Sequence, residues 1–172
     1  TSLNKLKQLK QQTKWNDYYD KNIDKDYLLE KEALIKKWIE FDYKFKTLVD
    51  FGCNTGNFSK LLAADVQNII AFDEDMRSVE ELYKYSRENN TRNIFCFTAN
   101  LSQPTPALGW NNMERPSLKE RIKGHLGLAL ALIHHLAISN HIQFNMMSHF
   151  FADTCTELFI EFIPKEDTKV QL

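Results

Sequence analysis

The residues of this chain best suited to chemistry are two glycines that bound a short loop and an acid that follows them. Gly52 and Gly56 lie just after an apolar run, residues 47–51, and Asp73 ends a second apolar run, residues 68–72. Glycine lets the backbone turn sharply and approach a ligand closely. A carboxylate at the end of a strand accepts hydrogen bonds from ribose hydroxyls. This order of residues predicts that a nucleoside-bearing cofactor binds at the edge of a parallel sheet.

The segments that must position these residues alternate between apolar runs and helical patterns. The helical patterns cover residues 57–64, 75–89 and 140–151, and the apolar runs, which we interpret as strands, cover 47–51, 68–72, 93–98, 126–133 and 157–163. The run 126–133 fits a strand or a helix, and the regular alternation favours a strand there. Strands that are almost continuously apolar are typical of a parallel sheet that helices cover on both faces. The pattern therefore predicts a doubly wound α/β fold.

Two further segments flank or interrupt this alternation. Residues 1–46 have a lysine-rich helical pattern, and we predict a helical N-terminal extension there, followed by a cofactor-binding α/β domain over residues 47–172. A chain of 172 residues suits a single core, so we expect one domain overall. Residues 103–116 have the composition of a loop, and Ser117 with Glu120 three residues later predicts a capping box at a helix start.

The composition is that of an ordinary soluble globular protein. Hydrophobic residues make up 43% of the chain, charged residues make up 26%, and the net charge is −1. This balance produces no overall field that would attract nucleic acid or a membrane surface. No apolar stretch is long enough to span a bilayer, and the start lacks the apolar block of a signal peptide. We therefore predict a cytoplasmic protein with no membrane partner.

Cysteines and histidines do not indicate a metal site. Cys53, Cys96 and Cys155 are odd in number and widely spaced, which argues against a zinc site and against a disulfide framework. The histidines include no helical pair with a supporting acid, as in H-E-x-x-H. We predict reduced thiols and no bound metal.

The loop 50–56, the acid Asp73 and the order of elements from residue 47 to residue 163 resemble the class I S-adenosylmethionine-dependent methyltransferases. The resemblance implies a Rossmann-like methyltransferase fold, S-adenosylmethionine as the cofactor and methyl transfer as the activity. It also implies that the glycine loop lies under the methionine part of the cofactor, that Asp73 binds the ribose hydroxyls and that Asn100 lies beside the adenine. The cofactor-binding residues that it implies are Asp50, Gly52, Cys53, Asn54, Gly56, Asp73 and Asn100.

Three features depart from the pattern of that family. Asn54 occupies a position that is often glycine, although asparagine tolerates a positive φ better than other non-glycine residues. Asn100 occupies a position that is often acidic. The family's sheet normally continues with two further strands after the fifth, and we expect these final strands to be missing from a chain that stops at Leu172.

A narrower resemblance covers residues 104–171. Gly109–Trp110, Glu114–Arg115, 128–136 and 161–167 look like a little-characterised subgroup of methyltransferases, some of which carry nodulation-related names. This subgroup names no substrate. The methyl acceptor stays open, and a small molecule, a protein and an RNA are all candidates.

Two adjacent histidines are the candidates for catalysis. In an open α/β sheet, ligands bind beyond the carboxyl ends of the strands where the strand order reverses, which for this family lies between the first and fourth strands. His134 and His135 would end the fourth strand and would lie beside the predicted methyl group. Histidine titrates near neutral pH and can take the proton that an acceptor loses. We interpret either histidine as a general base or an orienting residue, and ordinary packing is the alternative.

Two charged residues are candidates for binding the acceptor. Arg115 can clamp a carboxylate or phosphate, or it can simply pair with Glu114 or Glu120. Glu161 lies near the end of the fifth predicted strand, where the resembled fold often meets its substrate, and a solvent-exposed role is the alternative.

Two other functions stay open at this point. The first is a non-catalytic cofactor-binding or interaction module on a truncated copy of the fold. The second is a nicotinamide-dependent oxidoreductase, whose fingerprint requires G-x-G-x-x-G to hold a pyrophosphate. Only Gly52 and Gly56 are present here, in the spacing G-x-x-x-G, and this difference favours methyl transfer.

Overall fold

Five parallel strands form the sheet of this protein, for which the computed structural model describes residues 25–41 and 46–164. The strands are β1 (Thr47–Phe51), β2 (Asn68–Asp73), β3 (Ile94–Thr98), β4 (Gly124–Ala129) and β5 (Cys155–Ile160). Their order in the sheet is β3-β2-β1-β4-β5, and every neighbouring pair is parallel. The chain therefore moves outward from β1 in one direction to β3 and in the other direction to β5. The reversal lies between β1 and β4, as we predicted.

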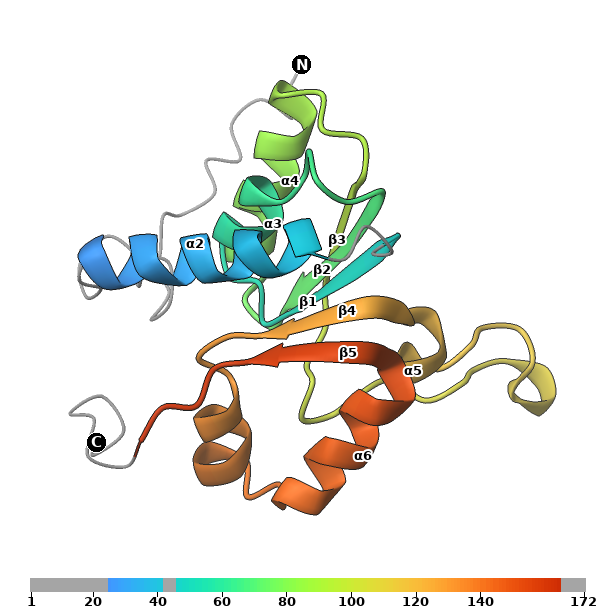
Figure 1. Ribbon diagram of the computed structural model, residues 1–172. Coiled ribbons are helices and arrows are strands. Elements are labelled where there is room, and N and C mark those ends of the chain that lie inside the picture. The colour runs from blue at the N-terminus through green and yellow to red at the C-terminus, as the bar shows by residue number, and fades with distance from the viewer. Residues whose placement is uncertain (1–24, 42–45, 165–172) are drawn as a thin grey trace, which may run out of the picture.

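Helices cover both faces of the sheet, and side chains that alternate along each strand enter two cores. On one face lie α2 (Lys25–Phe41), α3 (Asn57–Leu61) and α4 (Met76–Glu88), and on the other lie α5 (Leu118–Arg121), the π-helix η3 (His135–Ser139) and α6 (Phe144–Thr154). Leu48 of β1 packs with Ile35 of α2 and Leu82 of α4. The next residue, Val49, packs with Phe151 of α6 on the opposite face. The doubly wound α/β fold is therefore confirmed (Figure 1).

The described part of the predicted N-terminal extension is α2, which shares the core of the sheet. Ile35 and Ile39 are buried with Leu62, which follows α3, and with Leu126 of β4. Residues 1–24 and 42–45 of the segment that we predicted to be helical lie outside the described residues.

The structure corrects the predicted ends of the later elements. The first three predicted strands lie within one residue of β1, β2 and β3. The fourth does not extend over 126–133, because Ala131 adopts a positive φ of 49° that ends the extended backbone beyond Ala129. An apolar run this short fits a strand or a buried turn equally well, which is why its pattern was misleading. The helix predicted at 140–151 is α6 at 144–154, and β5 begins and ends earlier than 157–163.

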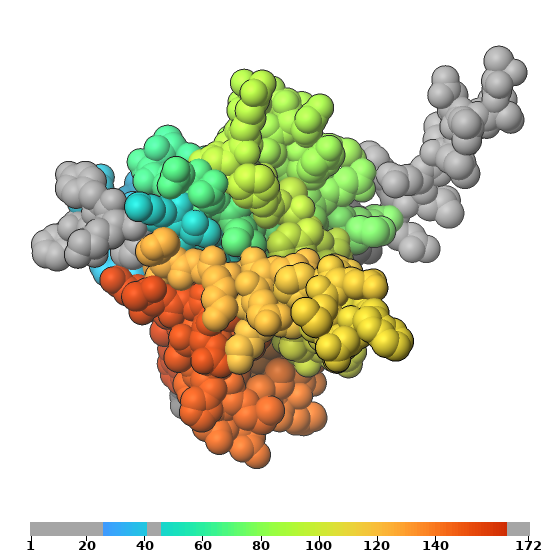
Figure 2. Space-filling view, turned by 90° about the vertical axis from the view of Figure 1, so that its right-hand side faces the viewer, coloured from blue at the N-terminus to red at the C-terminus, as the bar shows by residue number. Residues whose placement is uncertain are grey.

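The connection between β3 and β4 contains a hairpin instead of a long helix. Leu108 and Arg115 pair in an antiparallel bridge around the short 3-10 helix η2 (Trp110–Asn112). The predicted capping box follows it: the Glu120 backbone N–H donates to Ser117 Oγ, and the Ser117 backbone N–H donates to Glu120 Oε2. Figure 2 looks onto this side of the molecule, where the hairpin is coloured yellow.

The described residues also allow two statements about membranes and metals. Within residues 25–41 and 46–164, no helix combines the length and the apolar character that crossing a bilayer requires. The same residues contain no cluster of three or more histidine, cysteine, aspartate or glutamate side chains that could hold a metal ion.

Candidate functional site

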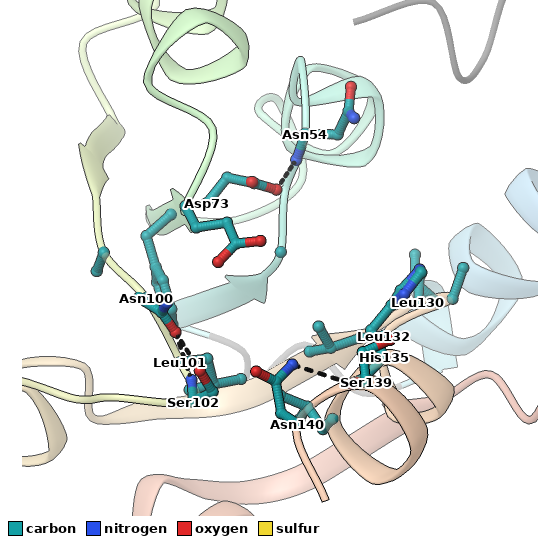
Figure 3. A pocket seen from close by; sticks show the side chains of 16 residues that line it. Asn54, Asp73, Asn100, Leu101, Ser102, Leu130, Leu132, His135, Ser139 and Asn140 are labelled. Atoms are coloured by element: carbon teal, nitrogen blue, oxygen red, sulfur yellow. Dashed lines mark hydrogen bonds between the residues drawn. The ribbon is translucent and has the colours of Figure 1, made fainter. Parts of the chain in front are cut away.

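A cavity lies at the carboxyl ends of the strands, at the reversal between β1 and β4 (Figure 3). The ends of β1, β2 and β3, the turn after β4 and the π-helix η3 form its wall. The lining residues are Gly52, Asn54, Phe72, Asp73, Glu74, Ala99, Asn100, Leu101, Ser102, Leu130, Ala131, Leu132, His135, Leu136, Ser139 and Asn140. Of the predicted cofactor-binding residues, the structure places Gly52, Asn54, Asp73 and Asn100 in this wall, and their binding of a cofactor stays a prediction.

The loop after β1 owes its shape to three residues with positive φ. Gly52, Asn54 and Gly56 have φ values of 70°, 50° and 78°, so Asn54 does adopt the conformation that its position required. The backbone N–H groups of Gly52 and Cys53 both donate to the Phe72 carbonyl at 3.0 Å, which joins the loop to the end of β2. A Cβ at Gly56 would lie 2.4 Å from Leu82 Cδ1, so glycine also permits the close packing of α4 against the loop.

Asp73 connects this loop to the cavity wall. Its Oδ2 accepts a hydrogen bond from the Asn54 backbone N–H at 2.8 Å, and its Oδ1 accepts one from the Asp75 backbone N–H at 2.9 Å. Burial raises the pKa of Asp73, although these two N–H groups oppose the rise. A carboxylate offers about four lone-pair sites, so Asp73 can accept further hydrogen bonds from a ligand.

Asn100 lies across the cavity from the loop. Its Oδ1 accepts hydrogen bonds from the Ser102 backbone N–H at 2.8 Å and from Ser102 Oγ at 2.7 Å. Because the oxygen is already engaged, the group of Asn100 that can bind a ligand is its amide NH₂.

Asp50, Cys53 and Gly56 are not among the residues that line the cavity. Asp50 is 4% exposed and accepts a hydrogen bond from Ser59 Oγ at 2.6 Å. Burial raises the pKa of Asp50 to about 6 and raises the pKa of the Cys53 thiol well above its ordinary value. Asp50 therefore supports the loop at the end of β1, and Cys53 and Gly56 are part of the loop without lining the cavity.

The structure corrects the position of the two histidines. They do not end β4: the chain turns at Ala131, and the pair follows in the helical segment that includes η3. His135 lines the cavity, His134 does not, and their ring centroids lie 3.9 Å apart. A π-helix is a rare geometry that is often found at functional sites.

The site also contains residues that the sequence reasoning missed. Ser102, Ser139 and Asn140 bring polar groups to the cavity, and Asn140 Nδ2 donates to the His135 carbonyl at 3.0 Å. The sequence gives little indication of these residues. They lie several residues beyond the predicted strands, as many loop residues without a function also do.

Comparison with known proteins adds a relative and several solved structures. No family model matches the chain. Over 130 residues the chain is 32% identical to the nodulation protein NoeA of Rhizobium meliloti (strain 1021), a match that covers 75% of this chain and 27% of NoeA. The chain therefore spans about a quarter of the length of that relative. NoeA confirms the resemblance to proteins with nodulation-related names.

Methyltransferases are among the solved structures that match. The bifunctional kinase-methyltransferase WbdD matches with a TM-score of 0.58 and 16% identity, over 83% of this chain and 29% of WbdD. Coclaurine N-methyltransferase, in a structure with N-methylheliamine and SAH, matches with a TM-score of 0.56 and 13% identity, over 77% of this chain and 34% of that chain. The chain therefore has the Rossmann-like fold of these methyltransferases.

In this methyltransferase fold, the two candidate acceptor residues lie away from the cavity wall. Arg115 is exposed on the hairpin, where its backbone pairs with Leu108. Glu161 accepts hydrogen bonds from Lys31 Nζ at 2.6 Å and from the Tyr27 hydroxyl, so it is tied to α2. The structure brings neither residue to the cavity, and their assignment to an acceptor stays a prediction.

Proposed function

We propose that this chain binds S-adenosylmethionine in the cavity and catalyses transfer of its methyl group to an acceptor. The observation that carries the proposal is the position of Asp73, whose carboxylate joins the cavity wall to the glycine loop through the Asn54 backbone N–H. A half-buried carboxylate beside a loop of bare backbone suits a ribose and an amino-acid tail held side by side.

The residues present fit that cofactor. Asp73 would accept hydrogen bonds from the ribose hydroxyls, and the amide NH₂ of Asn100 would donate to the adenine. The backbone from Gly52 to Asn54 would lie beneath the methionine tail, where the first residue has no side chain to block it. Asp50 and Ser59 would hold this loop in place from below through their hydrogen bond at 2.6 Å.

S-adenosylmethionine supplies an electrophilic methyl group on its sulfonium sulfur, so the protein's tasks are alignment and proton removal. His135 is the candidate for taking a proton from the acceptor, because it lines the cavity and histidine titrates near neutral pH. The ring of His134 lies against it and restricts its orientation. Leu130, Leu132 and Leu136 make that side of the cavity apolar and limit the access of water.

The structure offers less support for a nicotinamide cofactor. Such a cofactor places its pyrophosphate at the N-terminus of the helix after the glycine loop. Here that helix, α3, has only five residues. We also propose a cytoplasmic location, where Cys53, Cys96 and Cys155, which form no disulfide, would stay reduced.

The first prediction concerns cofactor affinity. Calorimetric titration should detect binding of S-adenosylhomocysteine, and Asp73→Ala should weaken it roughly 10- to 100-fold, or about 1.5–3 kcal/mol, as expected for losing hydrogen bonds to a charged group. The matched control is Asp65→Ala, which removes an exposed carboxylate outside the cavity and should leave the affinity unchanged. Binding of NADH in place of S-adenosylhomocysteine, or an unchanged affinity of Asp73→Ala, would contradict the proposal.

A further inference from the structure

The two most exposed large apolar side chains among the described residues belong to the hairpin between β3 and β4. Trp110 is 86% exposed and Met113 is 79% exposed. We call residues 108–115 the arm. Figure 1 shows the arm projecting away from the sheet, on the side opposite the carboxyl ends of the strands. The proposed cofactor site uses none of its residues.

The arm holds its tip in one defined shape. The Leu108 backbone N–H donates to the Arg115 carbonyl at 2.9 Å, and the Asn112 N–H donates to the Gly109 carbonyl at 3.0 Å. Asn111 and Asn112 both have positive φ, a conformation that asparagine accepts more readily than most residues. Tryptophan is enriched among the residues that dominate binding energy at interfaces, and a rigid anchor loses little entropy on binding. The arm therefore has the properties of a preformed interface anchor.

A second apolar surface lies close to the base of the arm. We call it the groove; it is lined by Thr47, Asn68, Ile70, Phe95, Phe97, Arg121 and Lys123. Phe95, on the edge strand β3, is 54% exposed. Residues 99–123, all of which the structure describes, contain only η2 and α5, of three and four residues, so no long helix from this connection covers the groove.

The arm and the groove are complementary in chemistry. Trp110 and Met113 need an apolar surface, and the groove offers the side chains of Ile70 and Phe95. Glu114, which is also exposed, follows Met113 on the arm, and two cations, Arg121 and Lys123, border the groove. The Arg121 guanidinium lies 5.9 Å from the centroid of the Phe97 ring, so a cation already lies over an aromatic side chain of the groove. Opposite charges around an apolar centre are what set partner choice at interfaces.

The two surfaces lie on the same side of the molecule, near the amino ends of the strands. Arg121 donates from its guanidinium to Thr105 Oγ1 at 3.3 Å, and the Leu118 backbone N–H donates to the Thr105 carbonyl at 2.9 Å. These contacts hold Thr105, which lies three residues before the arm, beside Arg121 of the groove, while the arm itself projects away from the sheet (Figure 1). Two adjacent, complementary surfaces that cannot meet within one copy can meet across a two-fold axis.

We propose that two copies of this chain form a two-fold dimer in which Trp110 and Met113 of each arm occupy the groove of the other copy. Glu114 then faces Lys123 of the second copy. The groove lies at the amino ends of the strands and the cofactor cavity lies at their carboxyl ends, so the dimer leaves both cavities open. The dimer and the proposed methyltransferase activity can therefore fail independently.

The first test measures mass in solution by analytical ultracentrifugation over a range of concentrations. The wild-type chain should be a dimer, and the double variant Trp110→Ala, Met113→Ala should raise the dimer dissociation constant roughly 30-fold or more, as for a central interface anchor. The matched control is Met76→Ala, another exposed apolar residue, at 68% exposed, which should leave the dimer intact. A monomeric wild-type chain, or a dimer that both variants leave intact, would overturn the proposal. Titration of the same samples with S-adenosylhomocysteine reports on the cofactor site separately.

The second test uses complementation. Phe95→Glu should remove the groove, and Trp110→Ala should remove the arm, so each variant alone should be monomeric. An equimolar mixture should form heterodimers, because the Phe95→Glu copy retains its arm and the Trp110→Ala copy retains its groove. Lys123→Glu gives a check that does not alter the apolar surface: it should weaken the dimer, and Glu114→Lys added to it should restore association. A mixture that stays monomeric while both chains keep a wild-type circular dichroism spectrum would contradict the exchange of arms.

Discussion

At the scale of single residues, two carboxylates beneath and beside the loop differ in what they can contact. Asp50 is buried and accepts a hydrogen bond from the Ser59 hydroxyl. Asp73 lines the cavity and accepts a hydrogen bond from the backbone N–H of Asn54. Burial raises the pKa of both carboxyl groups. The negative charge of Asp73 raises the pKa of Asp50 further, and the positive charge of Lys31 lowers it. The environment of Asp50 therefore suits it to stabilising the loop, and the environment of Asp73 suits it to binding a ligand.

The second prediction concerns the pH dependence that Asp50 imposes on stability. Its pKa in the folded protein, about 6, lies above its ordinary 3.8, so the folded state holds an extra proton between these values. This contribution to stability is present below about pH 4 and is lost as the pH rises to about 6. Asp50→Asn stays neutral and can still accept the hydrogen bond of Ser59. In urea unfolding, the free energy of unfolding of the variant relative to the wild type should rise by about 2.5 kcal/mol between pH 4 and pH 7.

The control for this prediction is Asp65→Asn, which removes an exposed carboxyl group and should not change the pH dependence. A stability difference between Asp50→Asn and the wild type that is constant over the same pH range would show that Asp50 titrates normally.

The third prediction separates the two histidines. His135→Gln should lower the transfer of labelled methyl groups into a cell extract by roughly 100-fold or more, as for losing a general base, without changing the affinity for S-adenosylhomocysteine. His134→Gln should have the smaller effect, because His134 does not line the cavity. Transfer that continues undiminished in the His134→Ala, His135→Ala double variant would exclude a histidine base.

At the scale of elements, one ion pair attaches α2 to the segment after β5. Lys31 and Glu161 meet at 2.6 Å with side chains that are 9% and 10% exposed. The Lys31 ammonium also lies 5.2 Å from the centroid of the Phe58 ring in α3. Helix α2 is therefore held across β5 and α3 by a nearly buried cation, and this explains why Glu161 does not reach the cavity.

The fourth prediction tests this attachment by measuring free energies of unfolding. Lys31→Met should cost about 3 kcal/mol or more, because it leaves the charge of Glu161 buried without its partner. The double variant Lys31→Met, Glu161→Leu should recover most of that loss, because it buries no charge. The exposed pair of Lys84 and Glu80, at 2.7 Å, is the matched control, and Lys84→Met should cost less than about 0.5 kcal/mol. A double variant as unstable as the single one would show that the charge is not the cause.

At the scale of the whole molecule, the sheet order brings together segments that are far apart in the chain. The turn after β4 and the π-helix η3 face the loop after β1 and the end of β2 across one cavity. A ligand that contacts both sides binds only the folded chain, and it therefore stabilises the fold by mass action.

The fifth prediction follows from this linkage. S-adenosylhomocysteine at a concentration 100 times its dissociation constant should raise the free energy of unfolding by about 2.7 kcal/mol. The same concentration should stabilise Asp73→Ala much less, and NADH should have no effect. Thermal and urea unfolding with each ligand measure these shifts, and equal stabilisation by NADH would contradict the assignment of the cavity.

Much of the fold and of the cofactor side of the cavity is predictable because those features are local in sequence. The run 47–51 forms β1, Asn54 takes its positive φ, and Ser117 caps α5, since each depends on neighbours a few residues away. The other side of the cavity, formed by the turn after β4 and by η3, is less predictable. Apolar periodicity at 126–133 does not reveal the turn at Ala131, and this turn decides that His135 and not His134 reaches the cavity.

The parallel α/β sheet, the glycine loop and the acid that follows it can be predicted from the amino-acid sequence, because backbone propensity and hydrophobic pattern are short-range properties. Three features are visible only in the folded chain: Glu161 pairs with Lys31, Asp50 is buried with a raised pKa, and the Trp110 side chain is exposed. The physical reason is that charge, burial and exposure depend on segments that the sheet brings together from distant parts of the chain.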